Sequence, residues 1–158
     1  MNTIESFHGE YRWLSNFWPA RVFFDGFWYA SVEHAYQAAK TVSDIEREMM
    51  RAATKPGEAK RLGRRVTVRS DWDDIKLKVM EELVRQKFNR HPTLAAKLVA
   101  TDDAELVEGN GWGDRFWGVS PVGSTGTGFN HLGRILMKVR ADMQVSAATE
   151  AFLDEIVR

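Results

Sequence analysis

Large apolar residues near the start of the chain predict a β-hairpin. Two short runs rich in aromatic and β-branched residues, 21–24 and 27–29, flank Asp25-Gly26. This dipeptide between two apolar runs is the strongest short-range signal for a tight hairpin turn. Beyond the hairpin the apolar spacing changes to three and four residues, which is the period of an α-helix. The chain is therefore expected to begin as β structure and to continue mainly as helices.

Capping residues and helix breakers divide the remaining apolar pattern into helices. Ser43 and Glu46 form a capping box, and the helix behind it carries one apolar stripe, made of Ile45, Met49 and Ala53. Asn130 is a favourable N-cap residue for the last helix of the core. The expected helices run from Ser31 to about Thr41, from Ser43 to Ala53, from Pro56 to Gly63, from Ser70 to about His91, briefly after Pro92, from Asn130 to Met143 and from Ser146 to Arg158.

A glycine-rich segment separates a short expected strand, 105–108, from the last core helix. Because 7 of the 12 glycines lie between Gly109 and Gly128, residues 109–129 are expected to form a loop. Strands do not alternate with helices, which excludes a doubly wound sheet. The predicted fold class is α+β: a mainly α-helical single domain with a short N-terminal β-hairpin and a glycine-rich loop before the last core helix.

Composition narrows the function classes. A chain of 158 residues has room for one domain. Its 22 Lys and Arg balance 22 Asp and Glu, which argues against a surface that binds duplex nucleic acid through bulk positive charge. The absence of cysteine excludes disulfides, thiol nucleophiles and cysteine zinc sites. Neither a signal peptide nor a membrane-spanning run is recognised, so a cytoplasmic protein is expected.

Aromatic residues gather at the N-terminal end of the chain. Of the 18 Phe, Trp and Tyr, 11 fall within the first 36 residues. Such rings either stack on a planar ligand or fill the core of a short β region. We expect these early rings mainly to build the core of the hairpin, beneath the helix that starts after Ser31.

That helix places four side chains on one face at the i, i+3, i+4 and i+7 spacing: Glu33, Tyr36, Gln37 and Lys40. A carboxylate, a phenol, an amide and an amine therefore project into one region. One interpretation is a solvated helix face whose first-turn acid interacts favourably with the helix dipole. The tyrosine on this face, and the rings just before it in the sequence, favour a face that looks into a cleft.

Further candidates lie outside this helix. The glycine-rich loop lacks the order of a P-loop, but its backbone can approach a ligand closely, and it leads into a helix N-terminus that suits an anion. The alternative is a mobile loop anchored by Trp117. Arg64 follows a helix and suits a phosphate group, and Trp72 is either a core residue or a stacking platform. The histidines lack metal-ligand spacing and no Gly-x-Ser-x-Gly elbow occurs, so we expect no metal site and no serine hydrolase of that type.

Taken together, the motifs resemble the NADAR (YbiA-like) family of N-glycosidases. Their order and spacing match the family from about residue 6 to residue 143, which predicts a domain over 1–144 and a C-terminal helical tail over 145–158. The matching segments are Trp13-Leu14-Ser15-Asn16-Phe17, Asp25-Gly26, residues 31–40, Glu58-Ala59-Lys60, Leu62-Gly63-Arg64, Arg69-Ser70-Asp71-Trp72, Lys87-Phe88, Leu106-Val107-Glu108, Phe116-Trp117-Gly118, Gly128, residues 130–134, Leu136-Met137 and Val139-Arg140.

The resemblance implies cleavage of the bond between a base and the anomeric carbon of a phosphorylated ribose. The implied substrates are ribosylaminopyrimidine phosphates of riboflavin biosynthesis or ADP-ribosylated guanine, as a nucleoside or in DNA. Neither a cofactor nor a metal is implied. The implied catalytic residues are Glu33 and Lys40, and the implied substrate-binding residues are Asn16, Phe17, Tyr36, Gln37, Arg64, Trp72, Trp117, Gly118 and Asn130.

The implied chemistry suits these residue types. A carboxylate can stabilise positive charge on the sugar or activate water, and a neutral lysine amine can attack the anomeric carbon. Two other hypotheses stay open at this point. A non-catalytic module that binds ADP-ribose or a nucleotide would need the tryptophans and Arg64 but not Glu33 and Lys40. A helical interaction protein would account for the tail but not for the glycine-rich loop.

Overall fold

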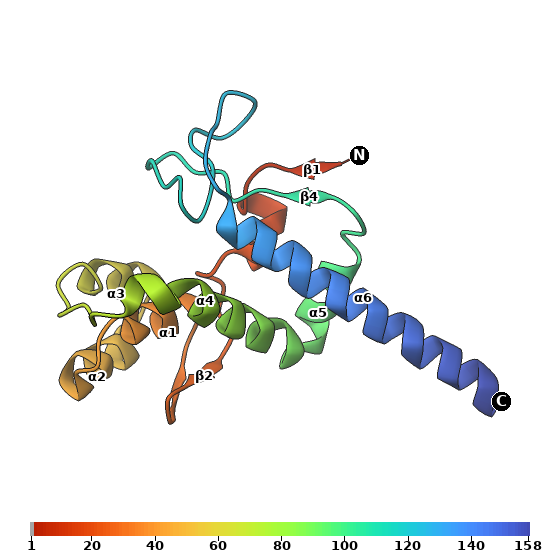
Figure 1. Ribbon diagram of the computed structural model, residues 1–158, viewed down its shortest axis with the longest axis horizontal. Coiled ribbons are helices and arrows are strands. Elements are labelled where there is room, and N and C mark those ends of the chain that lie inside the picture. The colour runs from red at the N-terminus through yellow and green to blue at the C-terminus, as the bar shows by residue number, and fades with distance from the viewer. Residues whose placement is uncertain (1) are drawn as a thin grey trace. The chain divides into compact units, whose positions relative to one another are not determined.

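The computed structural model describes residues 2–158 of the chain (Figure 1). The chain forms two compact units: one is Arg12–His91, and the other joins the N-terminal residues through Tyr11 to Pro92–Arg158. Helices predominate, and the strands form two sheets of two strands each. The predicted α+β, mainly helical class is therefore confirmed.

In the unit Arg12–His91, the hairpin forms where the sequence predicts it. Strands β2 (Val22–Phe24) and β3 (Phe27–Tyr29) pair antiparallel around Asp25 and Gly26, whose φ angles of 44° and 91° suit the favoured two-residue hairpin turn. The side chain of Gln86 then bonds the edge of β2. It accepts a hydrogen bond from the backbone N–H of Phe23 at 2.8 Å and donates one to the Phe23 carbonyl at 2.7 Å.

The first helix, α1 (Val32–Ala39), is the centre of this unit. It contacts both hairpin strands and the three other helices of the unit, which are α2 (Asp44–Ala52), α3 (Pro56–Leu62) and α4 (Trp72–Asn89). Figure 1 shows α1, α2 and α3 gathered at one side of the hairpin and α4 running past it. All eight residues of α1 are buried. The interpretation of a solvated helix face is thus wrong, because a helix packed on all sides has no solvent face.

The apolar stripe expected on α2 is also wrong. Of the three stripe residues only Ala53 is buried, whereas Met49 is exposed and 77% of Ile45 is accessible to solvent. Met50 and Arg47 take the inner face instead. The Arg47 guanidinium is buried because it is paired: its Nε donates to the Thr41 carbonyl at 2.9 Å, and its other end forms a salt bridge with the Asp25 carboxylate.

The early aromatic residues fill the core only in part, contrary to the expectation. Tyr29 is buried, as are the early rings Phe7, Trp13 and Tyr36, but 37–48% of Phe23, Phe27 and Trp28 is accessible to solvent. Arginine side chains cover these outer rings: Arg51 lies 3.8 Å from the centroid of Phe27, and Arg21 and Arg90 lie 4.9 and 5.0 Å from that of Trp28. One face of the two-stranded hairpin packs on the helices. On the other face, the arginine guanidinium groups cover the aromatic rings and reduce their contact with water.

The other unit contains a two-stranded parallel sheet and two helices. Strand β1 (Thr3–Ile4) pairs with β4 (Glu105–Leu106), and α5 (Pro92–Val99) packs against α6 (His131–Val157). A 3₁₀-helix, η1 (Gly9–Leu14), leads from this unit into the other. The sequence prediction places a strand at 105–108 but omits β1, because two residues are too short to show a periodic pattern. The segment 109–129 is a loop as predicted, with only isolated bridges such as Ser120 to Thr127.

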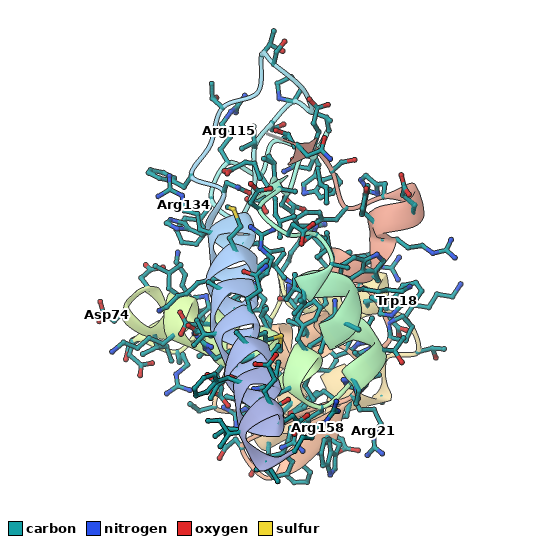
Figure 2. The ribbon with its side chains drawn as sticks, turned by 90° about the vertical axis from the view of Figure 1, so that its right-hand side faces the viewer. Trp18, Arg21, Asp74, Arg115, Arg134 and Arg158 are labelled. Carbon is teal, nitrogen blue, oxygen red and sulfur yellow. The ribbon has the colours of Figure 1, made fainter. Side chains whose placement is uncertain are left out.

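The last helix is longer than expected. We predict two helices meeting after Met143, but α6 continues without a break to Val157. No glycine or proline lies between Met143 and Ala148, so nothing in the sequence ends the first helix. Figure 2 shows Arg134 near the start of α6, beside the loop that carries Arg115, and Arg158 at the opposite end. The tail over 145–158 is thus mostly the C-terminal half of α6, and its separation as a region from residues 1–144 stays a prediction.

Candidate active site

Helix α1 begins at a fixed position because its first turn is capped and anchored. Ser31 has an extended backbone, and its hydroxyl oxygen accepts a hydrogen bond from the backbone N–H of His34 at 3.2 Å. The imidazole of His34 is buried, with Nδ1 2.7 Å from the same hydroxyl and Nε2 3.0 Å from the Ala53 carbonyl. His34 therefore ties α1 to the end of α2 and belongs to the scaffold of the site.

Glu33 is a buried carboxylate held from two directions. Its backbone N–H donates to the Asn16 carbonyl at 3.2 Å, and its Oε1 accepts a hydrogen bond from Gln37 Nε2 at 2.7 Å. Only 7% of the residue is accessible. The Asn16 side chain lies against α4, where its Nδ2 is 3.4 Å from Met80 Sδ. Asn16 and Gln37, both predicted to bind substrate, are thus placed beside Glu33.

Gln37 occupies a space that only a glycine leaves open. A Cβ atom at Gly63 would lie 1.8 Å from Gln37 Oε1. Gly63 itself has φ −60°, which any residue adopts, so its lack of a side chain is needed for space and not for backbone freedom. Within residues 2–158 the Oε1 atom is buried and accepts no hydrogen bond from the protein. It is therefore an available acceptor next to the Glu33 carboxylate.

Lys40 follows α1 directly and is only half-buried. Burial lowers the pKa of its ammonium below the usual lysine range, and three cations, Lys60, Arg64 and Lys76, lower this pKa further. The Glu33 carboxylate opposes them and raises the Lys40 pKa, but the net shift is downward. A carboxylate and four cationic side chains therefore lie near one another. They come from α1, α3, α4 and the turns that follow α1 and α3. Arg64, predicted to bind phosphate, is thus one of the cations that act on Lys40.

Three aromatic rings of the same unit lie along this cluster. Tyr36 packs against Trp72 with ring centroids 5.2 Å apart, and Lys40 Nζ lies 5.5 Å from the centroid of Tyr36. Trp72 is buried, so most of its surface is already in contact with protein. Phe17 differs, since 39% of it is accessible, and Lys60 Nζ lies 5.8 Å from its ring centroid. Phe17 is the ring of this group with the most surface left for a ligand.

The remaining three predicted residues, Trp117, Gly118 and Asn130, belong to the other unit. Asn130 holds strand β4: its Oδ1 accepts from the Glu108 N–H at 2.9 Å and its Nδ2 donates to the Leu106 carbonyl at 2.9 Å. Asn130 occupies the N-cap position of α6, as predicted, and its carbonyl accepts a hydrogen bond from the Arg134 N–H at 3.0 Å. Its φ is 53°, however, and its side chain bonds the strand instead of capping α6. The ligand-binding roles of these three residues stay predictions.

Close packing of the backbone explains the glycines of this loop. A Cβ atom at Gly118 would lie 2.0 Å from the Glu108 carbonyl oxygen, and one at Gly128 would lie 2.2 Å from the Gly118 carbonyl oxygen. Trp117 packs edge to face on Phe116, with centroids 4.8 Å apart. The loop is thus closely packed on itself and on the residue that follows β4, and this packing explains its glycines without a freely mobile loop.

A buried lysine on α4, for which no role is predicted from the sequence, supports the segment beside Glu33. Lys87 is almost completely inaccessible, its Nζ donates to the Ser15 carbonyl at 2.8 Å, and burial lowers its pKa to about 7. The Ser15 carbonyl directly precedes Asn16, so Lys87 holds the segment that supports Glu33. A signal for this role exists in the sequence: Lys87 follows Met80, Leu83 and Val84 at the spacing of the apolar stripe.

Comparison with known proteins identifies the class. The NADAR domain model matches residues 5–144, and the chain belongs to this family. It is 40% identical over 139 residues to an N-glycosidase of Nostoc punctiforme, covering 85% of this chain and 86% of that protein. It is 36% identical over 151 residues to N-glycosidase YbiA of Escherichia coli, covering 91% of each. A riboflavin biosynthesis protein of Vibrio vulnificus is 41% identical over 136 residues, which are 85% of this chain and 36% of that protein.

A solved structure agrees with these matches. The NMR structure of the E. coli protein YbiA aligns with a TM-score of 0.79 and 32% sequence identity, over 94% of this chain and 89% of that one. The family and the enzyme class predicted from the sequence, a hydrolase that acts on N-glycosyl bonds, are confirmed. Within residues 2–158, no helix is long and apolar enough to cross a membrane.

Proposed function

We propose that this N-glycosidase hydrolyses the bond between a base and the anomeric carbon of a phosphorylated ribose, with Glu33 and Lys40 as its catalytic residues. The observation that carries the proposal is the placement of Glu33. Its carboxylate is buried, oriented by the Gln37 amide, and near enough to Lys40 to influence the pKa of that amine. Burial is the feature that separates Glu33 from a solvated surface acid, whose charge water would screen.

The carboxylate suits the charge that develops during the reaction. When the ribose C–N bond breaks, positive charge spreads over the anomeric carbon and the ring oxygen. A fixed negative charge in a poorly hydrated site stabilises such a transition state more strongly than the same charge in water. The Gln37 amide keeps one carboxylate oxygen in place, so no reorientation is needed at the moment of reaction.

The lowered pKa of Lys40 supports a role as nucleophile. A larger share of the amine is then neutral near pH 7, and only the neutral form can attack carbon. Attack on the anomeric carbon forms a C–N bond to lysine while the bond to the base breaks, and the base leaves with the bonding electron pair and takes up a proton. Loss of a proton from the amine and opening of the sugar ring give a Schiff base, which water hydrolyses to free ribose phosphate and lysine. In the alternative route, Glu33 directs water to the same carbon and Lys40 stays unmodified.

The surrounding cations support a phosphorylated substrate. Lys60, Arg64 and Lys76 lie close enough to Lys40 to lower its pKa, and although Lys76 also forms a salt bridge with Asp73, this grouping of cations favours the binding of an anion. A ribose phosphate supplies that anion. A bound phosphate would also raise the Lys40 pKa and so reduce the share of neutral, nucleophilic amine. A phosphate held by Arg64 and Lys60, farther from Lys40, would bind the substrate with a smaller effect of this kind.

Two substrates fit this description. Relatives named as riboflavin biosynthesis proteins support a ribosylaminopyrimidine phosphate as the first candidate. The second candidate is ADP-ribosylated guanine, as a nucleoside or in DNA, and it is favoured by the exposed ring of Phe17, which offers a surface for a longer ligand. A module that binds ADP-ribose without cleaving it would need neither the buried Glu33 nor the Glu33–Lys40 proximity.

The test is an assay of base release from both substrates by the purified protein and four variants. We expect Glu33→Gln and Lys40→Ala each to lower turnover by roughly a hundredfold or more, the usual scale for a group that transfers protons or attacks substrate. Glu82→Gln and Lys78→Ala, at exposed positions on α4, are the matched controls and should retain turnover. Reduction with borohydride during turnover should add the sugar to Lys40 if the Schiff-base route is used. Full activity of Glu33→Gln and Lys40→Ala would refute the proposal.

A further inference from the structure

The C-terminal part of α6 carries an exposed stripe of apolar side chains, which begins just after residue 144, where the match to the NADAR domain ends. The stripe repeats at intervals of four, three and four residues, as one side of a helix requires, and two further residues widen it. Its six residues, together termed the tail stripe, are Val145, Ala148, Thr149, Phe152, Leu153 and Ile156. All six are exposed, with 61% of Phe152 and 64% of Ile156 accessible to solvent. Figure 1 shows this end of α6 continuing past α5, the helix that packs on it.

The tail stripe lies on the opposite side of α6 from the residues that build the core of its unit. At about 3.6 residues per turn, five turns take about 18 residues. Glu150 and Asp154 therefore continue the line of the buried Leu132 and Leu136. Phe152 lies roughly 160° around the helix axis from Leu136. The tail stripe is thus not an extension of the core, because the side of the tail in line with the core is acidic.

The stripe side of α6 also changes character along the helix. Arg134 and Lys138 are exposed and lie five turns before Phe152 and Ile156, on the same side of the helix. This side is therefore basic in the first half of α6 and apolar in the second half. A helix end that only extended into water would be polar all round. The tail stripe has instead the character of a surface that is buried against another molecule.

The tail stripe is suited to packing against a copy of itself. It contains no charged side chain, and the Thr149 hydroxyl donates to the Val145 carbonyl at 3.0 Å, so burial does not leave that donor unpaired. If two tails lie antiparallel with residues 150 and 151 at the centre, Phe152 of each copy faces the smaller Thr149 of the other. Ile156 then faces Val145, and Leu153 faces Ala148. Large and small side chains alternate across the contact, which is the arrangement that fills a helix interface.

The charges outside the stripe disfavour other partners. Residues 145–158 contain three acids, Glu150, Asp154 and Glu155, and one base, Arg158. Their excess negative charge repels nucleic acids and acidic membrane surfaces. In the antiparallel pair, Glu150 and Asp154 stay on the far side of each helix and do not meet.

The area of the stripe indicates how strong such a contact can be. Since one aromatic side chain alone buries ~150–250 Å², two tail stripes would remove on the order of 1,000 Å² from water, near the lower limit for specific interfaces. This area suits a dimer that forms and dissociates in the micromolar range, and it is too small for a permanent one.

We propose that two copies of this chain associate through antiparallel packing of their tail stripes. The resulting dimer has two-fold symmetry, which is the commonest symmetry among protein dimers. Glu33 and Lys40 belong to the unit Arg12–His91 and take no part in the contact. N-glycosidase turnover per chain should therefore be the same in monomer and dimer.

Sedimentation equilibrium of the full chain over the micromolar range tests the association. The wild type should change from monomer to dimer mass as its concentration rises, and Phe152→Glu and Ile156→Glu should each weaken the dimer about tenfold or more, the scale of losing a central interface residue. Ala147→Glu adds the same charge at an exposed position on the opposite side of the helix and is the matched control, which should dimerise normally. Circular dichroism and turnover report that the variants are folded. A wild type that stays monomeric at all concentrations overturns the proposal and leaves the stripe to a different protein, and equally strong dimers of Phe152→Glu and Ile156→Glu overturn it by placing the contact elsewhere.

Disulfide cross-linking tests the antiparallel orientation. Because the chain contains no cysteine, a single introduced thiol reports on its own position only. An oxidised mixture of Val145→Cys and Ile156→Cys should form a linked dimer of the two variants, since those positions face each other, whereas Val145→Cys alone should not link. A mixture of Ala147→Cys and Ile156→Cys is the control and should stay unlinked. Linking of Val145→Cys to itself would show a parallel pair and overturn the orientation, as would a Val145→Cys and Ile156→Cys mixture that fails to link.

Discussion

Replacing Lys87 by methionine should remove a pH dependence from the stability of the protein. Lys87 is buried, and its pKa in the folded protein is about 7, against an ordinary value of 10.5. Between these values the unfolded chain binds a proton at this position that the folded protein does not bind. Unfolding then takes up a proton, so the free energy of unfolding must rise with pH over that range.

The size of the effect follows from the two pKa values. Between the two pKa values, the free energy of unfolding rises by roughly 1.4 kcal/mol for each pH unit. This rise begins near pH 7, where the folded protein loses the Lys87 proton. From about pH 6 to about pH 9, the stability of the wild type relative to Lys87→Met should therefore rise by about 3 kcal/mol. The lost hydrogen bond to the Ser15 carbonyl adds an offset of about 1 kcal/mol that changes little with pH while Lys87 stays bonded. Lys40 also has a lowered pKa, but it is present in both proteins and cancels.

Urea unfolding followed by tryptophan fluorescence at several pH values measures this difference. The variant Lys78→Met, at an exposed position on the same helix, controls for the general loss of one positive charge. A difference between wild type and Lys87→Met that stays constant across the pH range would refute the reasoning, because it would mean that Lys87 keeps its proton in the folded protein or is hydrated there.

Three further predictions concern the site itself. Gln37→Ala should lower kcat about tenfold with little change in KM, because the amide orients Glu33 and its loss leaves that carboxylate mobile; an effect on KM alone would identify Gln37 as a substrate contact instead. Gly63→Ala should destabilise the protein by about 1–3 kcal/mol in urea unfolding, since its Cβ collides with Gln37, and unchanged stability would mean that the amide moves aside at little cost. Lys76→Gln should raise the pKa of Lys40, so the acidic limb of the rate profile should move to higher pH, and a shift to lower pH would contradict the assigned electrostatics.

Local signals in the sequence were sufficient for most elements of the unit Arg12–His91. Asp25-Gly26 predicts the hairpin, and Ser31 predicts the start of α1, because both depend on backbone geometry within a few residues. The burial of α1 was only suggested by the tyrosine on its polar face. Which face of α2 is buried was predicted wrongly, because the pairing of Arg47 with Asp25 joins residues far apart in the chain and makes a charged residue more suitable for the interior than Ile45.

The residue types of the candidate site could be predicted from the sequence, but the contacts between its side chains could not. As candidates, Glu33 and Lys40 follow from helical spacing and family motifs, and the structure adds the lowered pKa of Lys40; their catalytic role stays a proposal. That Gln37 serves Glu33, and that Gly63 makes room for it, depends on the packing of α3 against α1. No pattern within one helix contains that information.

The complete burial of α1 has a consequence for how this enzyme can change. Every position of the helix contributes to the core, so a substitution that adjusts the chemistry at Glu33 also disturbs folding, and few such substitutions will be tolerated. Lys55 and Arg61 are exposed, so substitutions there disturb less buried surface. Sequence differences among relatives should therefore be more frequent at such exposed positions than on α1, and a library intended to alter the enzyme without unfolding it would begin there.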